Sequence, residues 1–146
     1  MTTSPLEIRR LRPGDDHVLG TVAPGTFDEP VDASLTAEFL GDARHHMFVA
    51  LDGGVVVGMI SAVHYLHPDK PTELWINEVG VAPSHQRQGI ARRLLDAMLA
   101  HGRALGCVEA WLGTEEHNHA ARRLYESCGG SAEPFLMYTF GLGPDA

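Results

Sequence analysis

The segment Arg87–Leu105 constrains the fold more than any other part of the sequence. Its apolar and small residues recur at spacings of three and four, at Ala91, Leu94, Leu95, Met98, Gly102 and Leu105. On an α-helix this spacing forms one apolar stripe, which must be buried against other elements. Gly106 follows at the position where a glycine commonly ends a helix. We therefore expect a helix over 87–105 that packs one face into a core.

Strand-like and helix-like segments alternate around this helix. Gly53 and Gly54, which follow Asp52, supply the positive φ angles of a tight hairpin turn. We expect strands at residues 6–11, 47–51, 55–63, 74–81, 107–112 and 135–140. Further helices are expected up to about Leu19, over 34–40 with Gly41 as the cap, and over 118–128. This order predicts an α/β fold in one domain, 1–146, with helices on both faces of a mixed sheet.

Composition excludes several classes of protein. With 44% apolar and 21% charged residues, the chain resembles an average globular domain. No apolar run approaches the roughly 20 residues that span a bilayer, and Met1–Arg10 lacks the apolar core of a signal peptide. Cys107 and Cys128 lack metal-ligand spacing, which favours reduced thiols and a cytoplasmic location. The formal net charge of -8 disfavours a nucleic acid partner and favours a cationic ligand.

A strand that runs through a short turn into the long helix predicts an anion site. The strand ends in Asn77-Glu78-Val79-Gly80-Val81-Ala82-Pro83, and the helix opens with Gln86-Arg87-Gln88-Gly89-Ile90-Ala91. The first backbone N–H groups of a helix have no partner within it, and they lie at the positive end of its dipole. Gly89 lets a phosphate approach the backbone, and Arg87 or Arg92 can add positive charge.

The pattern Gln86-x-x-Gly89-x-Ala91 resembles the pyrophosphate-binding signature of the GCN5-related N-acetyltransferases, the GNAT superfamily. A second pattern at the expected distance, Asn118-x-x-Ala121-x-x-Leu124-Tyr125-x-x-x-Gly129, matches the helix motif of the same superfamily. Gly130 departs from it, because an aromatic residue is usual there. The resemblance implies a GNAT fold with a mostly antiparallel sheet, acetyl-CoA as cosubstrate and no metal. The cofactor-binding residues that it implies are Val79, Gly80, Val81, Gln86, Arg87, Gln88, Gly89, Ile90, Ala91, Arg92, Asn118, Ala121 and Tyr125.

Direct transfer of acetyl from a thioester to an amine needs a base, an oxyanion site and a proton donor. On a regular strand Leu74, Ile76 and Glu78 share one face, so Glu78 would end an apolar row and is the candidate base. Either burial raises its pKa, or a water relays the proton to it. A structural carboxylate, or a bulge that shifts the alternation, remains the alternative. Tyr125, which the family motif implies as donor, suits protonation of the thiolate, although its position also fits a core residue. The resemblance implies that the amides of Val79 to Val81 bind the oxyanion.

Two other chemistries find little support in the sequence. Cys128 has no sequence neighbour that would activate it as a nucleophile. The pairs His45-His46 and His117-x-His119 have neither the helical spacing nor the cysteine ligands of common zinc sites. His64 and His67 flank a loop before the Glu78 strand and are candidates for lining the acceptor pocket.

The whole chain resembles the class I aminoglycoside 3-N-acetyltransferases, through the phrase Glu73–Val81, the preceding loop Tyr65–Pro71 and the short length. This resemblance implies an aminoglycoside acceptor and a resistance role. Several carboxylates that could bind its ammonium groups lie in the loop 22–31, just after it, or near the two motifs. The candidate substrate-binding residues are Asp28, Glu29, Asp32, His64, Glu73, Asn77, Glu78, Glu115 and Glu116. Open alternatives are a polyamine, amino acid or protein N-terminus as acceptor, or a non-catalytic acyl-CoA-binding protein; a homodimer is possible by analogy.

Overall fold

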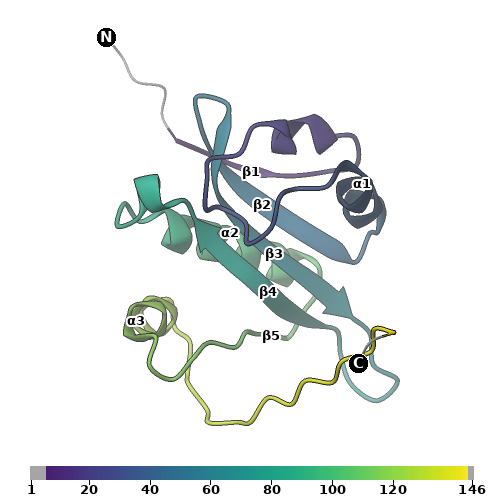
Figure 1. Ribbon diagram of the computed structural model, residues 1–146. Helices are drawn as coiled ribbons and strands as arrows, with labels where there is room; N and C mark the ends of the chain where they lie inside the picture. Colours follow the sequence, from purple (N-terminus) through teal and green to yellow (C-terminus); the bar gives the residue numbers. More distant parts are fainter. Residues whose placement is uncertain (1–5, 145–146) are drawn as a thin grey trace. The chain divides into compact units, whose positions relative to one another are not determined.

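The computed structural model describes residues 6–144, which form two compact units, Met1–Gly113 and Thr114–Ala146 (Figure 1). Each unit is considered by itself. The first contains the whole sheet and the long helix, and the second contains one further helix. Across residues 6–144, no helix has the length and apolarity that a bilayer crossing requires.

The first unit is a five-stranded sheet in the order β1-β2-β3-β4-β5. Its neighbours pair antiparallel except for β4 and β5, which are parallel. The elements in chain order are β1 (Glu7–Arg10), the 3₁₀ helix η1 (Asp16–Gly20), α1 (Ala33–Gly41), β2 (His45–Asp52), β3 (Val55–Tyr65), β4 (Glu73–Val81), the 3₁₀ helix η2 (Pro83–His85), α2 (Ile90–Ala104) and β5 (Glu109–Trp111). The predicted mixed, mostly antiparallel α/β fold is confirmed.

Helices cover both faces of this sheet. On one face, Leu40 of α1 and Leu19 of η1 join a core with Met47, Val49 and Met59. On the other face α2 passes behind the strands in Figure 1 and buries Leu94, Met98 and Gly102. Close packing there relies on glycine, because a Cβ on Gly58 would lie 3.0 Å from Ile90 Cγ2. The central strand β3 is therefore apolar along most of its length, since both of its sides are buried.

Several predicted boundaries differ from those observed. The long helix begins at Ile90 instead of Arg87, because Arg87 and Gly89 have φ angles of 64° and 76°, which interrupt a right-handed helix. Gly41 is the last residue of α1 rather than its cap, and Asp42 takes the capping position. The strand predicted at 107–112 is reduced to Glu109–Trp111.

The strand predicted at 135–140 is wrong. This apolar segment has no strand structure, and Phe135, Leu136 and Tyr138 are exposed. A strand needs a hydrogen-bonded neighbour, and the described part of the second unit contains no strand that could pair with it. Apolar, β-branched or aromatic composition alone therefore did not determine the structure of this segment.

The second unit is organised by α3 (His119–Ser127). The Asn118 side chain caps its start by accepting a hydrogen bond from the Ala121 N–H at 3.2 Å. Gly129, at a φ of 95°, follows the end of the helix. At Gly130, where an aromatic residue was expected, a Cβ would lie 2.9 Å from the Tyr125 carbonyl oxygen. The close return of the chain over the end of α3 thus explains a glycine at this position.

Candidate active site

A β-bulge at Asn77 changes the face of the sheet to which Glu78, the candidate base on β4, points. Ile76 lies opposite Ala62 of β3, yet Glu78 lies opposite Ser61, so Asn77 is an extra residue in the ladder. Residues opposite each other in an antiparallel pair point to the same face, and one inserted residue reverses the alternation. Glu78 therefore lies on the opposite face from Leu74 and Ile76, and the predicted shared row is wrong.

Glu78 lies on the face of the sheet that is covered by α1 and η1, and α2 covers the opposite face. Met59 and Ser61 alternate along β3 on that side, opposite Gly80 and Glu78. Glu78 is exposed rather than buried at the end of an apolar row. Solvent water therefore has direct access to the carboxylate.

The loop between η1 and α1 is fixed beside the end of β4. The Ala23 N–H donates to the Val56 carbonyl at 2.9 Å, and the Thr26 hydroxyl donates to the Ala23 carbonyl at 2.7 Å. A Cβ on Gly80 would lie only 2.5 Å from the Thr26 carbonyl oxygen, so the loop backbone packs directly on β4. Gly25 similarly lies against the ring of Pro83. The loop that carries the acidic candidates therefore adjoins the strand that carries Glu78.

The same loop encloses a shallow hollow of about 420 Å³, with Asp28 and Glu29 among its lining residues. Both carboxylates are exposed and remain available to a cationic ligand. Asp32 differs from them, because its Oδ1 accepts a hydrogen bond from the Leu35 N–H at 2.8 Å and caps α1. Of the three acidic candidates in this region, two line the hollow and the third has a structural partner.

The turn between β4 and α2 is held by side chains on both sides. His85 Nε2 lies 2.8 Å from Oδ2 of Asp52, the last residue of β2, and its Nδ1 lies 2.7 Å from the Ser84 hydroxyl. The Gln86 side-chain amide donates to the Val81 carbonyl at 3.3 Å, so Gln86 bridges the end of β4 to the turn. These contacts fix the path of the chain before the predicted phosphate-binding residues.

The first backbone amides of α2 precede its hydrogen-bonded ladder. The first intrahelical hydrogen bond runs from the Arg93 N–H to the Gly89 carbonyl at 3.2 Å, so the amides of Ile90 and Ala91 precede the helical ladder. Arg87 and Gly89 both have left-handed φ angles, the kind of conformation in which successive N–H groups form an anion-binding concavity. Nothing lies within 4 Å of the position of a Cβ on Gly89. The turn is therefore open to an anion, and Arg87, Gln88 and Arg92 are exposed around it.

Other predicted site residues lie elsewhere. His64 is on the α2 face, opposite Leu74, and so on the other side of the sheet from Glu78. Glu73 contacts His67, with Oε1 2.7 Å from Nε2. The remaining candidates belong to the second unit: the exposed carboxylates Glu115 and Glu116, the cap Asn118, and the half-buried Ala121 and Tyr125. Burial raises the pKa of Tyr125, which keeps the phenol protonated at neutral pH.

A row of three histidines on the α2 face was not predicted from the sequence. His46 Nε2 lies 2.7 Å from His64 Nδ1, and His46 Nδ1 lies 3.2 Å from His101 Nε2. His46 is buried. It lies between His64 and His101 and contacts both, so the three rings form a row and do not point toward a common centre. Among residues 6–144, no three His, Cys, Asp or Glu side chains are grouped as ligands for a metal ion.

Residues 16–130, which include strands β2 to β5, the open turn and α3, match the Acetyltransferase (GNAT) family. The chain is a GNAT acetyltransferase. As a member of this family it is an N-acetyltransferase that uses acetyl-CoA as the acetyl donor. This acetyltransferase is 31% identical over 129 residues to the N-alpha-acetyltransferase RimI of Mycobacterium tuberculosis, covering 87% of the chain and 79% of that protein.

Two solved structures resemble the fold of this acetyltransferase. An aminoglycoside acetyltransferase from an uncultured soil metagenomic sample, in complex with sisomicin, has a TM-score of 0.79 at 20% identity and covers 94% of this chain and 97% of its own. The aminoglycoside N-acetyltransferase AAC(6')-Iy, in complex with CoA, has a TM-score of 0.75 at 21% identity, with 97% and 98% covered. At these identities the likeness establishes the fold.

Acetyl-CoA fits the open turn of this acetyltransferase. Its diphosphate is the kind of anion that unpaired helix-start amides bind, and nothing lies within 4 Å of the position of a Cβ on Gly89 that would exclude it. The residues that would hold the diphosphate are the predicted Gln86, Arg87, Gln88, Gly89, Ile90 and Ala91. When bound, the coenzyme supplies the thioester carbonyl that an amine attacks.

Proposed function

We propose that this acetyltransferase acetylates an amino group of an aminoglycoside by direct transfer in a ternary complex, as one catalytic domain spanning residues 1–146. The net charge of -8 and the exposed carboxylates Asp28, Glu29 and Glu78 favour an acceptor with several ammonium groups. A resistance role in the cytoplasm and assembly as a homodimer belong to the same proposal.

One observation carries the proposal most directly. The bulge at Asn77 turns Glu78 to the face where the acidic loop packs against Gly80. An ammonium group held by this loop would thus approach the carboxylate from the loop side, and β4 leads directly into the phosphate-binding turn. The arrangement supports an acceptor amine meeting the thioester near the end of β4.

The proposed chemistry follows from these groups. Glu78 takes a proton from the acceptor ammonium through a water, which leaves a neutral amine. The amine nitrogen attacks the thioester carbonyl carbon, and the amides of Val79 to Val81 stabilise the oxyanion. The C–S bond then breaks, and Tyr125 donates its phenolic proton to the departing thiolate. The second proton, lost from nitrogen as the amide forms, returns to the phenolate through solvent. Glu78 releases the first proton to solvent, so both groups of the enzyme are regenerated.

The position of acetylation is the finer part of the proposal. The sequence resemblance favours the 3-amino group, whereas the designation of one solved neighbour, AAC(6')-Iy, favours a 6′-amino group. A protein N-terminus is a second candidate acceptor, because the 31% identity to an N-alpha-acetyltransferase spans most of both chains. These acceptors differ in charge, since an aminoglycoside has several ammonium groups close together.

Release of free CoA from acetyl-CoA, followed with a thiol reagent, separates these candidates. We expect CoA release with kanamycin, gentamicin or sisomicin, and little with spermidine or with peptides that have a free N-terminus. Release only with peptides or spermidine would contradict the aminoglycoside proposal, and no release with any amine would contradict turnover altogether. Mass spectrometry and NMR of the acetylated product would identify the nitrogen.

A further inference from the structure

Three aromatic rings form a cluster on neighbouring strands of the first unit. The Trp75 and Trp111 ring centroids are 4.7 Å apart at an interplanar angle of 73°, and Tyr65 and Trp111 are 6.5 Å apart at 67°. Trp75 and Trp111 are direct partners in the parallel β4–β5 pair. The rings therefore come from β3, β4 and β5 and lie together at the β5 side of the sheet.

This cluster lies on the same face as Glu78. Along β3, Ser61, Val63 and Tyr65 alternate to one side, and their partners on β4 are Glu78, Trp75 and Glu73. Without the bulge at Asn77, Glu78 and Trp75 would point to opposite faces. The Asn77 side chain also accepts a hydrogen bond from the Trp75 indole N–H at 3.4 Å. The bulge thus brings the carboxylate and the aromatic rings to one surface.

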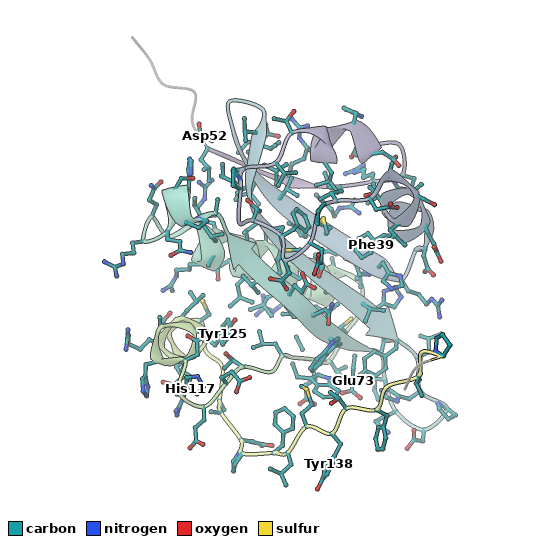
Figure 2. The ribbon with its side chains drawn as sticks, in the orientation of Figure 1. Phe39, Asp52, Glu73, His117, Tyr125 and Tyr138 are labelled. Atoms are coloured by element: carbon teal, nitrogen blue, oxygen red, sulfur yellow. The ribbon has the colours of Figure 1, made fainter. Side chains whose placement is uncertain are left out.

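The order of the residues along β4 sets the distance between two groups of a ligand bound on this surface. The strand runs from Glu73 through Trp75 and Glu78 to the phosphate-binding turn. Figure 2 labels Glu73 at one end of the sheet and Asp52, whose carboxylate contacts the turn through His85, toward the other. Trp75 and Glu78 are three residue steps apart along the strand, or about 10 Å at most. A group bound at the rings would therefore lie roughly this far from an amine at Glu78.

Charge and exposure indicate which group would bind at the rings. Trp111 is 45% exposed, so part of its ring remains open to a ligand. Glu109 lies opposite Glu73 across the β4–β5 pair, which gives the cluster two carboxylates on its face. Burial raises the pKa of the Tyr65 phenol, and the negative charge of Glu73 and Glu109 raises it further. Aromatic faces beside carboxylates attract an ammonium group and disfavour an anion.

We propose that Trp75, Trp111 and Tyr65, with Glu109, form a subsite for a second ammonium group of the acceptor, while the reacting amine lies at Glu78. The inference rests on the proposed function, because it assumes that the acceptor reaches Glu78. It adds a substrate requirement: the acceptor carries at least two ammonium groups separated by up to about 10 Å. The subsite contributes to acceptor binding, not to the chemical step.

Tryptophan fluorescence tests the subsite directly, because the chain contains two tryptophans and both are in the cluster. Titration of the full chain with kanamycin, in the presence of CoA, is expected to change the intensity or shift the emission maximum saturably. The change is expected to weaken as salt increases, since the contact is electrostatic. An emission spectrum unaffected by kanamycin at concentrations that saturate turnover would overturn the proposal.

Kinetics of matched variants provide the second test. Trp111→Ala is expected to raise the KM for kanamycin about 10-fold with kcat nearly unchanged, a loss that corresponds to about 1.4 kcal/mol. Trp111→Phe, which keeps an aromatic face, is expected to recover most of the affinity. Equal KM values for wild type and Trp111→Ala would overturn the subsite, as would a loss confined to kcat. Circular dichroism and CoA affinity check that each variant is folded.

The outcomes also separate this inference from the proposed function. If the wild type binds CoA but releases no free CoA from acetyl-CoA with any aminoglycoside, the proposed function fails. In that case we expect no fluorescence response to kanamycin either. If the wild type acetylates kanamycin while fluorescence and Trp111→Ala are both without effect, the function stands and the subsite is wrong.

Discussion

Glu78 lies opposite Ser61 across the β3–β4 pair, whereas Ile76, two residues earlier, lies opposite Ala62. One inserted residue, Asn77, therefore determines which side of the sheet the carboxylate occupies. Leu74 and Ile76 remain packed toward α2, and Glu78 joins Trp75 and the acidic loop on the other side. The proposed acceptor site depends on this single irregularity.

Replacing the carboxylate tests its role as a base. Glu78→Gln keeps the size and exposure of the side chain but cannot take a proton, so we expect kcat to fall roughly 10²-fold or more. CoA affinity is expected to stay unchanged. Glu38→Gln, an exposed position on α1, is the matched control. Steady-state kinetics that gave wild-type turnover for Glu78→Gln would remove Glu78 from the mechanism.

Gly80 tests the contact between β4 and the acidic loop. A Cβ at this position would lie 2.5 Å from the Thr26 carbonyl oxygen, so Gly80→Ala must displace the loop backbone. We expect a loss of about 1–3 kcal/mol of unfolding free energy and a higher acceptor KM. Gly20→Ala, where nothing lies within 4 Å of the new Cβ, is the control in denaturant titrations. Equal stability of the two variants would contradict the observed packing.

Tyr125 is expected to matter as a proton donor. Tyr125→Phe keeps the half-buried ring of α3 and removes the hydroxyl, so we expect kcat to fall at least 10-fold with little change in CoA affinity. Tyr138→Phe, in the same unit at a position 76% exposed, is the control; Figure 2 labels both tyrosines. If the two variants had the same kcat as the wild type, another group would protonate the thiolate.

The histidine row predicts how stability depends on pH. Burial, and next the charge of His101 and of His64, lowers the pKa of His46 to about 4 from its usual 6.5; Arg10 and His45 contribute in the same direction. The unfolded chain therefore takes up this proton first, and stability falls as pH drops from about 6.5 toward 4. Between pH 7 and pH 5 the loss is about 2 kcal/mol from this group.

Denaturant titrations at both pH values check this expectation. His46→Gln keeps a donor and an acceptor but does not titrate, so its unfolding free energy is expected to vary less between pH 7 and pH 5. His17→Gln, an exposed histidine in η1, is the control and should vary as the wild type does. An unchanged pH dependence in His46→Gln would show that other groups cause the acid sensitivity.

The features predicted correctly from sequence are local ones. The apolar stripe of α2 and the hairpin glycines Gly53 and Gly54 each depend on residues a few positions apart. The open turn at Gly89 is likewise a consequence of one strand leading into one helix. Short-range periodicity and turn chemistry were therefore sufficient for these elements.

The errors concern features that depend on pairing between distant segments. The alternation along β4 gave the wrong face for Glu78, because a bulge is visible only once β3 is its partner. The apolar segment 135–140 was predicted as a strand although no neighbouring strand pairs with it in the described part of its unit. His46 and His101 are 55 residues apart in the sequence, and nothing local indicated their contact.

Binding of CoA to the turn before α2 is the claim on which the account depends. Gly89→Glu would put a carboxylate where the diphosphate is proposed to bind, and Gly14→Glu is a matched control because Gly14 is also open, with a φ of 95° against 76° at Gly89. Isothermal titration calorimetry with CoA should give similar Kd values for the wild type and Gly14→Glu, and at least a 10-fold weaker Kd for Gly89→Glu. No detectable binding of CoA to the wild type, or an unchanged CoA affinity in Gly89→Glu, would contradict the claim that CoA binds to this turn.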